Sequence, residues 1–205
     1  SYFGQIMVTT NTHIGNYGIE KHESQSKGIS IAGLICKDFS FYFSRPSGTE
    51  SLFDYLRSHK LVTICDVDTR ALVNYIRENG AMNAVVSTNI GMEKKLLKEL
   101  ASSPSMEGLE LASKVSSKKS YTVGNPDSKY RIAAIDLGVK QNILHNMVER
   151  NMFVKVFPYD TSYKELEAFK PDGYFISNGP GDPLPLKGVQ SVAKTIIENN
   201  KPLFG

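Results

Sequence analysis

The sequence feature that most constrains the fold is a regular alternation of short apolar runs and amphipathic runs over residues 131–205. Short apolar runs bounded by turn residues are typical of buried strands, and apolar residues three and four apart are typical of helices. Strands that alternate with helices in this way predict a doubly wound parallel sheet that is covered on both faces. The predicted strands are 131–136, 153–157, 174–177 and 202–205, and the predicted helices are 139–151, 162–169 and 189–199.

The strand expected at 174–177 runs into a loop that consists almost wholly of turn residues, Asn178-Gly179-Pro180-Gly181-Asp182-Pro183. Because glycine has no Cβ, Gly179 and Gly181 let backbone N–H groups approach a bound anion or a developing oxyanion. Ligands of parallel α/β sheets bind beyond the carboxyl ends of the strands, which is where this loop lies. The alternative is a tight turn that leaves a strand and binds nothing.

Composition excludes several classes of protein. Lys and Arg outnumber Asp and Glu by only 24 to 21, and no basic cluster is interleaved with aromatic residues, so nucleic acid is not an expected partner. No apolar run approaches the ~20 residues that a membrane-spanning helix needs, so no membrane association is expected. Cys36 and Cys65 lie in apolar runs without metal-ligand spacing, which favours a reducing cytoplasm. The chain begins at Ser1 without a methionine or signal peptide, so we expect that its true N-terminus has been removed.

The first half predicts a mixed β/α domain over residues 1–115. Its periodicity fades after Leu111, and the polar, turn-rich stretch 116–130 is typical of an interdomain linker before the domain at 131–205. The predicted strands are 2–10, 28–37, 41–43, 61–65 and 83–87, and the predicted helices are 49–60 with a Thr49 cap, 71–79 and 93–101.

Several chemistry-bearing residues of the first half have simpler interpretations than catalysis. A single structural hydrogen bond is favoured for His13, which lies in an Asn- and Gly-rich loop. The pair Asp66 and Asp68 could suggest a metal or phosphoryl site, but helix capping by Asp68 and an ion pair with Arg70 explain it better. Cys65 precedes a helix but lacks the small neighbours of a nucleophile elbow, so we expect it in the core.

Gly138 and Lys140 could be mistaken for a phosphate-binding loop. The glycine-rich Walker pattern is absent, which favours a strand-to-helix turn at Gly138 and a surface lysine at Lys140.

Two stretches of the second half resemble class I glutamine amidotransferases. Phe175-Ile176-Ser177-Asn178-Gly179-Pro180-Gly181-Asp182-Pro183 resembles their oxyanion loop, and Lys201-Pro202-Leu203-Phe204-Gly205 resembles the strand that leads into their nucleophile elbow. The resemblance implies a flavodoxin-like fold. It also implies that the nucleophilic cysteine follows directly after Gly205, and that the catalytic histidine and glutamate come later still.

The first half narrows the resemblance to the small subunit of carbamoyl phosphate synthase. Ser1-Tyr2-Phe3-Gly4-Gln5-Ile6, Thr12-His13-Ile14-Gly15-Asn16-Tyr17-Gly18 and Asp66-Val67-Asp68-Thr69-Arg70-Ala71-Leu72 are similar to its amino-terminal domain. Asp136-Leu137-Gly138-Val139-Lys140-Gln141-Asn142-Ile143 is similar to the opening of its amidotransferase domain. The resemblance implies that 1–115 is the amino-terminal domain, incomplete at its start, and that 131–205 is an amidotransferase domain truncated before the elbow.

The family's activity implies a role for the whole protein. The small subunit would bind L-glutamine and release ammonia to a large subunit, a ligase that consumes MgATP and bicarbonate in making carbamoyl phosphate for arginine and pyrimidine biosynthesis. By position, Gly179 would donate its N–H to the oxyanion, and Gly181 and Ser1 would hold glutamine. The resemblance implies no metal or cofactor on this chain. Without the cysteine, we expect the 205 residues to be inactive alone.

Two alternatives remain open at this stage. A non-catalytic, amidotransferase-like module could dock on a synthetase and regulate it without releasing ammonia. Another glutamine-dependent synthase, such as those for anthranilate or GMP, could carry a similar glutamine domain, but the motif at 66–72 argues against this second alternative.

Overall fold

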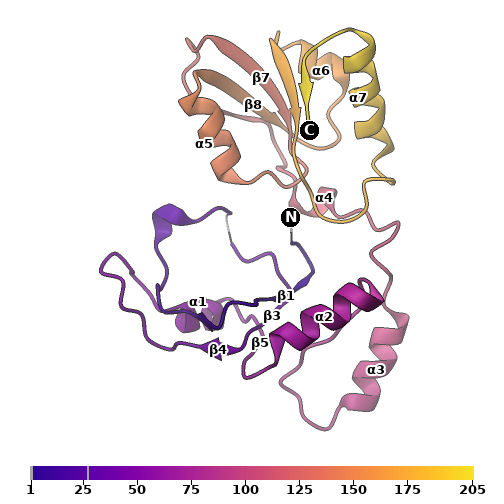
Figure 1. Ribbon diagram of the computed structural model, residues 1–205. Helices are drawn as coiled ribbons and strands as arrows, with labels where there is room; N and C mark the ends of the chain where they lie inside the picture. Colours follow the sequence, from indigo (N-terminus) through magenta and orange to yellow (C-terminus); the bar gives the residue numbers. More distant parts are fainter. Residues whose placement is uncertain (1, 27) are drawn as a thin grey trace. The chain divides into compact units, whose positions relative to one another are not determined.

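The chain divides after Ser105 into two units in a computed structural model that describes residues 2–26 and 28–205 (Figure 1). The unit at 106–205 contains the predicted doubly wound sheet, and the unit at 2–105 contains two smaller sheets. In the described part of the chain, no helix combines the length and the hydrophobicity needed to cross a membrane.

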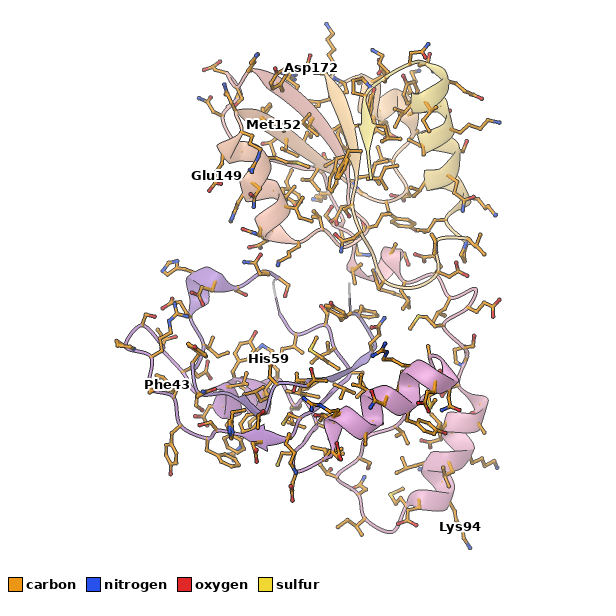
Figure 2. The ribbon with its side chains drawn as sticks, in the orientation of Figure 1. Phe43, His59, Lys94, Glu149, Met152 and Asp172 are labelled. Carbon is orange, nitrogen blue, oxygen red and sulfur yellow. The ribbon has the colours of Figure 1, made fainter. Side chains whose placement is uncertain are left out.

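A five-stranded sheet forms the centre of the unit at 106–205, with strand order β10-β9-β7-β8-β6. Four strands are parallel, and β6 is antiparallel to β8. Met152 and Asp172 lie at the edge of the sheet where β8 and β9 begin, so the opposite edge carries the carboxyl ends (Figure 2). The strands are β6 (Tyr121–Val123), β7 (Tyr130–Ile135), β8 (Met152–Phe157), β9 (Gly173–Ile176) and β10 (Leu203–Phe204), and the helices are α4 (Ala112–Val115), α5 (Gln141–Glu149), α6 (Tyr163–Glu167) and α7 (Lys187–Glu198).

Alternate residues of the strands face two separate apolar cores, which explains why helices cover both faces. On one face Ala134, Val154 and Phe175 pack with Leu144 of α5. On the other face the sheet packs against α6 and α7, with α5 on the far side (Figure 1). The buried residues of this second core are Ala112, Ala133, Ile135, Leu137, Phe153, Phe157, Leu166, Phe169, Tyr174, Val189 and Ile196. The predicted doubly wound, flavodoxin-like fold is confirmed.

The stretch 116–130 differs from the predicted linker. It contains β6, whose Thr122 pairs with Lys155 of β8, so this polar stretch forms an edge strand of the second unit's sheet. Its polar character reflects the exposure of an edge strand rather than a connection between domains. The division between the compact units lies earlier, after Ser105.

The unit at 2–105 is built from short parallel pairings. One sheet has the order β1-β3-β5 and the other pairs β2 with β4. The elements are β1 (Ile6–Val8), β2 (His13–Ile14), η1 (Lys21–Glu23), β3 (Gly33–Ile35), β4 (Asp38–Phe39), α1 (Leu52–Ser58), β5 (Thr63–Ile64), α2 (Thr69–Asn79) and α3 (Glu93–Ser102).

Two predicted strands of this unit are wrong. Residues 41–43 form no strand, because the Phe41 ring packs against Phe53 with centroids 5.2 Å apart instead of joining a sheet. Residues 83–87 form none either, although Val86 lies over Gly33 of β3: a Cβ on that glycine would be 2.7 Å from the valine Cγ2. Val86 therefore covers a sheet rather than extending it.

Two helices of this unit, α1 and α2, begin directly after a residue whose side chain caps them. Helix α1 begins at Leu52 and is capped by Ser51, whose Oγ accepts from Asp54 N, so the predicted Thr49 cap is wrong. Asp68 caps α2 as predicted by accepting from Ala71 N, and Gly80, with φ of 83°, ends it.

Candidate functional site

The candidate site lies where the strand order of the second unit reverses. From β7 the chain moves to β8 on one side and then to β9 on the other, so the loops after β7 and β9 leave adjacent strands at the same edge. A reversal of this kind opens a crevice beyond the carboxyl ends of the strands. The two loops at this position are 136–139 and 177–183.

Ser177 joins the two loops. It is 4% exposed, its N–H donates to Ile135 O, and its Oγ accepts from Leu137 N at 2.9 Å. The same hydroxyl donates to Asn178 O at 2.9 Å. One buried side chain therefore fixes the start of the glycine loop against the loop that follows β7.

Asp136 shapes the loop after β7. Its carboxylate is buried, and Oδ1 accepts from the N–H groups of Gly138 and Val139 while Oδ2 accepts from Ser117 N. Three backbone donors balance the desolvation of one negative charge. Sequence analysis missed this role, although an Asp directly after a buried strand and before a glycine is a turn signal.

Gly179 lies so close to this loop that no side chain fits. A Cβ at this position would be 2.4 Å from Leu137 O and 2.9 Å from Leu137 Cβ, both in a backbone segment that cannot move easily. Gly181 has φ of +81°, and its Cβ would be 2.5 Å from Leu109 O. Both positions therefore require glycine, for close approach at Gly179 and for approach and conformation at Gly181.

The group of this site that could interact with a ligand is a backbone N–H of the glycine loop. Within residues 2–26 and 28–205, the N–H of Gly179 donates to no protein acceptor, and this glycine is exposed. The following Pro180 is buried and has no N–H to offer. An exposed, unused N–H on a fixed backbone can stabilise negative charge on a ligand atom without reorganisation.

The last strand brings the chain to this loop. Leu203 and Phe204 of β10 pair in parallel with Tyr174 and Phe175 of β9. At Gly205, a Cβ would be 3.4 Å from Ile176 O, so the backbone after β10 lies beside the end of β9. A residue that follows Gly205 would start from a position next to the glycine loop.

The sequence also singled out Ser1, Gly138 and Lys140. Gly179 and Gly181 share one loop, whereas Ser1 lies outside the described residues. Gly138 forms the predicted turn, with φ of 119°, and Lys140 is an exposed residue before α5.

In the unit at 2–105, the isolated candidates have structural partners. His13 Nδ1 is 3.7 Å from Asp38 Oδ2, which is a structural contact but is too long for the predicted hydrogen bond. The ion pair predicted for the Asp66 and Asp68 motif is wrong in its partner: Asp66 pairs with Lys37 at 3.1 Å, because a positive φ at Asp66 turns the chain after β5. The same turn leaves Cys65 exposed, which contradicts the predicted core position.

Comparisons with known proteins agree with these features. Residues 1–86 match the family described as carbamoyl-phosphate synthase small chain, CPSase domain, and residues 133–205 match glutamine amidotransferase class-I. The whole chain is 37% identical to a carbamoyl phosphate synthase small chain of Synechococcus sp., 38% to one of Chlorobaculum tepidum and 36% to one of Vibrio parahaemolyticus. It spans 56%, 57% and 58% of these relatives, respectively.

The doubly wound sheet, the glycine loop at its switch point and the match over 133–205 define the second unit as a class I glutamine amidotransferase domain. Proteins of that class share the second unit, so the sequence of the first half is what separates one family of the class from another. With the match over 1–86 and relatives that align with its full length, the chain is similar throughout to carbamoyl phosphate synthase small chains.

Proposed function

We propose that this chain is the glutamine-binding part of a glutaminase subunit that supplies ammonia to a carbamoyl phosphate synthase. The observation that carries the proposal is the exposed N–H of Gly179, which has no protein acceptor among the described residues and lies where the neighbouring Leu137 leaves no room for a Cβ. A donor of this kind is what the amide oxygen of glutamine needs when it becomes an oxyanion.

The proposed reaction needs residues of this chain and a nucleophile that the family resemblance places after Gly205. A thiolate attacks the side-chain amide carbon of glutamine, and the carbonyl electron pair moves to oxygen, where the Gly179 N–H stabilises it. Collapse of this intermediate expels ammonia with one added proton and leaves a glutamyl thioester, which water hydrolyses to glutamate. Gly181 and Ser1 are proposed to hold the main-chain groups of the substrate.

The proposed partner is a large subunit that uses MgATP and bicarbonate to convert the ammonia to carbamoyl phosphate, in the cytoplasm, for arginine and pyrimidine synthesis. Because the thiol is the attacking group, residues 1–205 by themselves are expected to bind glutamine without hydrolysing it. Release of ammonia from these residues alone would contradict the proposed position of the nucleophile.

The test uses the full product of the gene that encodes this chain, together with its large subunit, and measures glutamate release. Gly179→Ala keeps the N–H, but its Cβ would clash with Leu137 and displace the donor from the oxyanion. The kcat with glutamine should therefore fall by about 10²- to 10³-fold, the usual effect of losing one oxyanion donor. The matched control is Gly188→Ala, because a Cβ at Gly188 meets no atom within 4 Å. Synthesis from added ammonium salt should be unchanged in both variants, since it bypasses glutamine.

Two outcomes would count against the proposal. Glutamate release by Gly179→Ala at the wild-type rate would remove this residue from the oxyanion site. A wild-type protein that binds the large subunit but releases no glutamate would favour a docking or regulatory role instead.

A further inference from the structure

The Asp182 carboxylate bonds to two parts of the chain that are far apart in sequence. Oδ1 accepts from Leu184 N at 2.8 Å, which is a local turn contact. Oδ2 accepts from Gly108 N at 2.8 Å, across 74 residues. The local bond alone would suffice for a turn, so the second bond has a separate consequence: it connects the glycine loop to the segment 108–111.

The backbone of that segment contacts the loop as well. Asp182 N donates to Leu109 O at 3.0 Å, and Glu110 forms an isolated antiparallel bridge with Gly181. This approach is what excludes a side chain at Gly181, whose Cβ would be 2.5 Å from Leu109 O and 3.2 Å from Leu111 N. The segment therefore forms one wall of the glycine loop.

The wall is itself held in place. Ala112 directly after it is 1% exposed within the core that α6 and α7 cover, and Glu110 Oε1 accepts from Ser113 N. The segment also lies between the two matched family ranges, 1–86 and 133–205. The loop that defines the amidotransferase site is thus braced by residues that the amidotransferase match does not include.

We propose that segment 108–111 and the Asp182 carboxylate act together as a clamp that holds the glycine loop in its substrate-binding conformation. Asp182 is then a positioning residue, acting through the backbone of Gly179 and Gly181 without touching the substrate. This inference rests on the proposed function, because it assigns the clamp to the glutamine site. Freed from the clamp, the loop would sample positions in which its N–H groups no longer meet the substrate oxygen.

The variants are Asp182→Ala, which removes both acceptors, and Asp182→Asn, which keeps one carbonyl acceptor in the same shape. The matched control is Asp127→Ala, because Asp127 is exposed in the same unit and its carboxylate makes no hydrogen bond within the described residues. Each is made in the full gene product with its large subunit. Two readouts are compared: steady-state kinetics with glutamine, and amide hydrogen exchange of peptides that cover 106–111 and 178–184.

Asp182→Ala is expected to raise KM for glutamine and to lower kcat/KM by about tenfold to a hundredfold, as expected for losing hydrogen bonds to a charged acceptor. Exchange should accelerate in both peptides. Asp182→Asn should recover part of both effects, because it keeps one of the two acceptors, and Asp127→Ala should match the wild type. A purely structural role would reduce the fraction of active protein, which lowers kcat and leaves KM unchanged.

The outcomes separate this inference from the proposed function. If wild-type protein releases no glutamate, the proposed function fails, and the exchange experiment still decides whether the clamp exists. If the wild type hydrolyses glutamine and Asp182→Ala retains its KM and its exchange rates, the clamp is overturned while the proposed function stands.

Discussion

The two units bury apolar surface to very different extents. The unit at 106–205 contains both apolar cores, on opposite faces of one sheet whose central strands β7 and β8 are six residues long. In the described part of 2–105, the buried apolar residues are Leu34, Cys36 and Leu56, and the strands are two or three residues long. The catalytic chemistry is thus proposed for the unit with the larger core, where close packing can hold backbone groups in fixed positions.

The largest expected contrast between the units comes from truncating one leucine in each. Leu166 on α6 is fully buried, and Leu166→Ala should destabilise the protein by about 2–5 kcal/mol. Leu97 on α3 is 62% exposed, so Leu97→Ala should change stability by no more than about 0.5 kcal/mol. Urea unfolding followed by circular dichroism measures both free energies. Equal losses would mean that α3 is buried against something that this unit does not contain.

The same contrast explains how far the sequence could predict the structure. In 131–205 the central strands β7 and β8 are six residues long and contribute to the cores on both faces, so that apolar runs such as 153–157 predicted elements with nearly correct bounds. In 2–105 the strands at 41–43 and 83–87 were predicted from the same kind of run, but Phe41 packs on another ring and Val86 covers β3. Short strands depend on tertiary contacts more than on local pattern.

The sequence also predicts the candidate site only in part. Gly179 and Gly181 could be identified from the loop sequence, because glycine and proline act through the local backbone. The contacts of Asp136 with Ser117 and of Asp182 with Gly108 join residues that are 19 and 74 positions apart. Nothing in a single sequence specifies such pairs.

A second contrast concerns two aspartates that accept backbone N–H groups. Asp136 is 5% exposed and satisfies three N–H groups, whereas the exposed Asp68 satisfies that of Ala71. Asp136→Ala leaves three partly buried N–H groups without partners and should cost about 3 kcal/mol, while Asp68→Ala should cost about 1 kcal/mol as an ordinary cap loss. The measurement is the free energy of unfolding at neutral pH. A smaller loss for Asp136→Ala than for Asp68→Ala would show that the loop after β7 can relax.

A third contrast concerns two carboxylates held by different partners. The pKa of Asp182 is lowered by backbone N–H donors, first that of Leu184 and then that of Gly108. The pKa of Glu23 is lowered by Arg45, which forms a bidentate pair with it at 2.6 and 2.7 Å. Both carboxylates therefore stabilise the fold above their ordinary pKa values of 3.8 and 4.5, and this contribution is lost as pH falls through the lowered values.

Salt should separate the two carboxylates in an NMR titration. At an ionic strength of about 1 M the screening length falls to about 3 Å, so the pKa of the exposed Glu23 should move back toward its ordinary value. The pKa of Asp182 should stay low, because fixed backbone dipoles, and not a mobile cation, hold it down. Equal salt dependence would mean that the charge of Lys187, rather than the backbone of segment 108–111, is the main cause of the lowered pKa of Asp182.

The smallest expected effect on stability belongs to the two cysteines of the unit at 2–105. Cys36 is fully buried, and its burial, together with the neighbouring Cys65 and Asp38, raises the pKa of its thiol. Cys65 is exposed after β5. Since the thiolate is the reactive form, a thiol reagent should modify Cys65 rapidly and Cys36 only when the unit unfolds. Cys65→Ser should abolish the fast phase and change the free energy of unfolding by no more than about 0.5 kcal/mol. If both thiols reacted rapidly in the folded protein, the three-stranded sheet of this unit would open locally without global unfolding, and its small core would limit its dynamics as well as its packing.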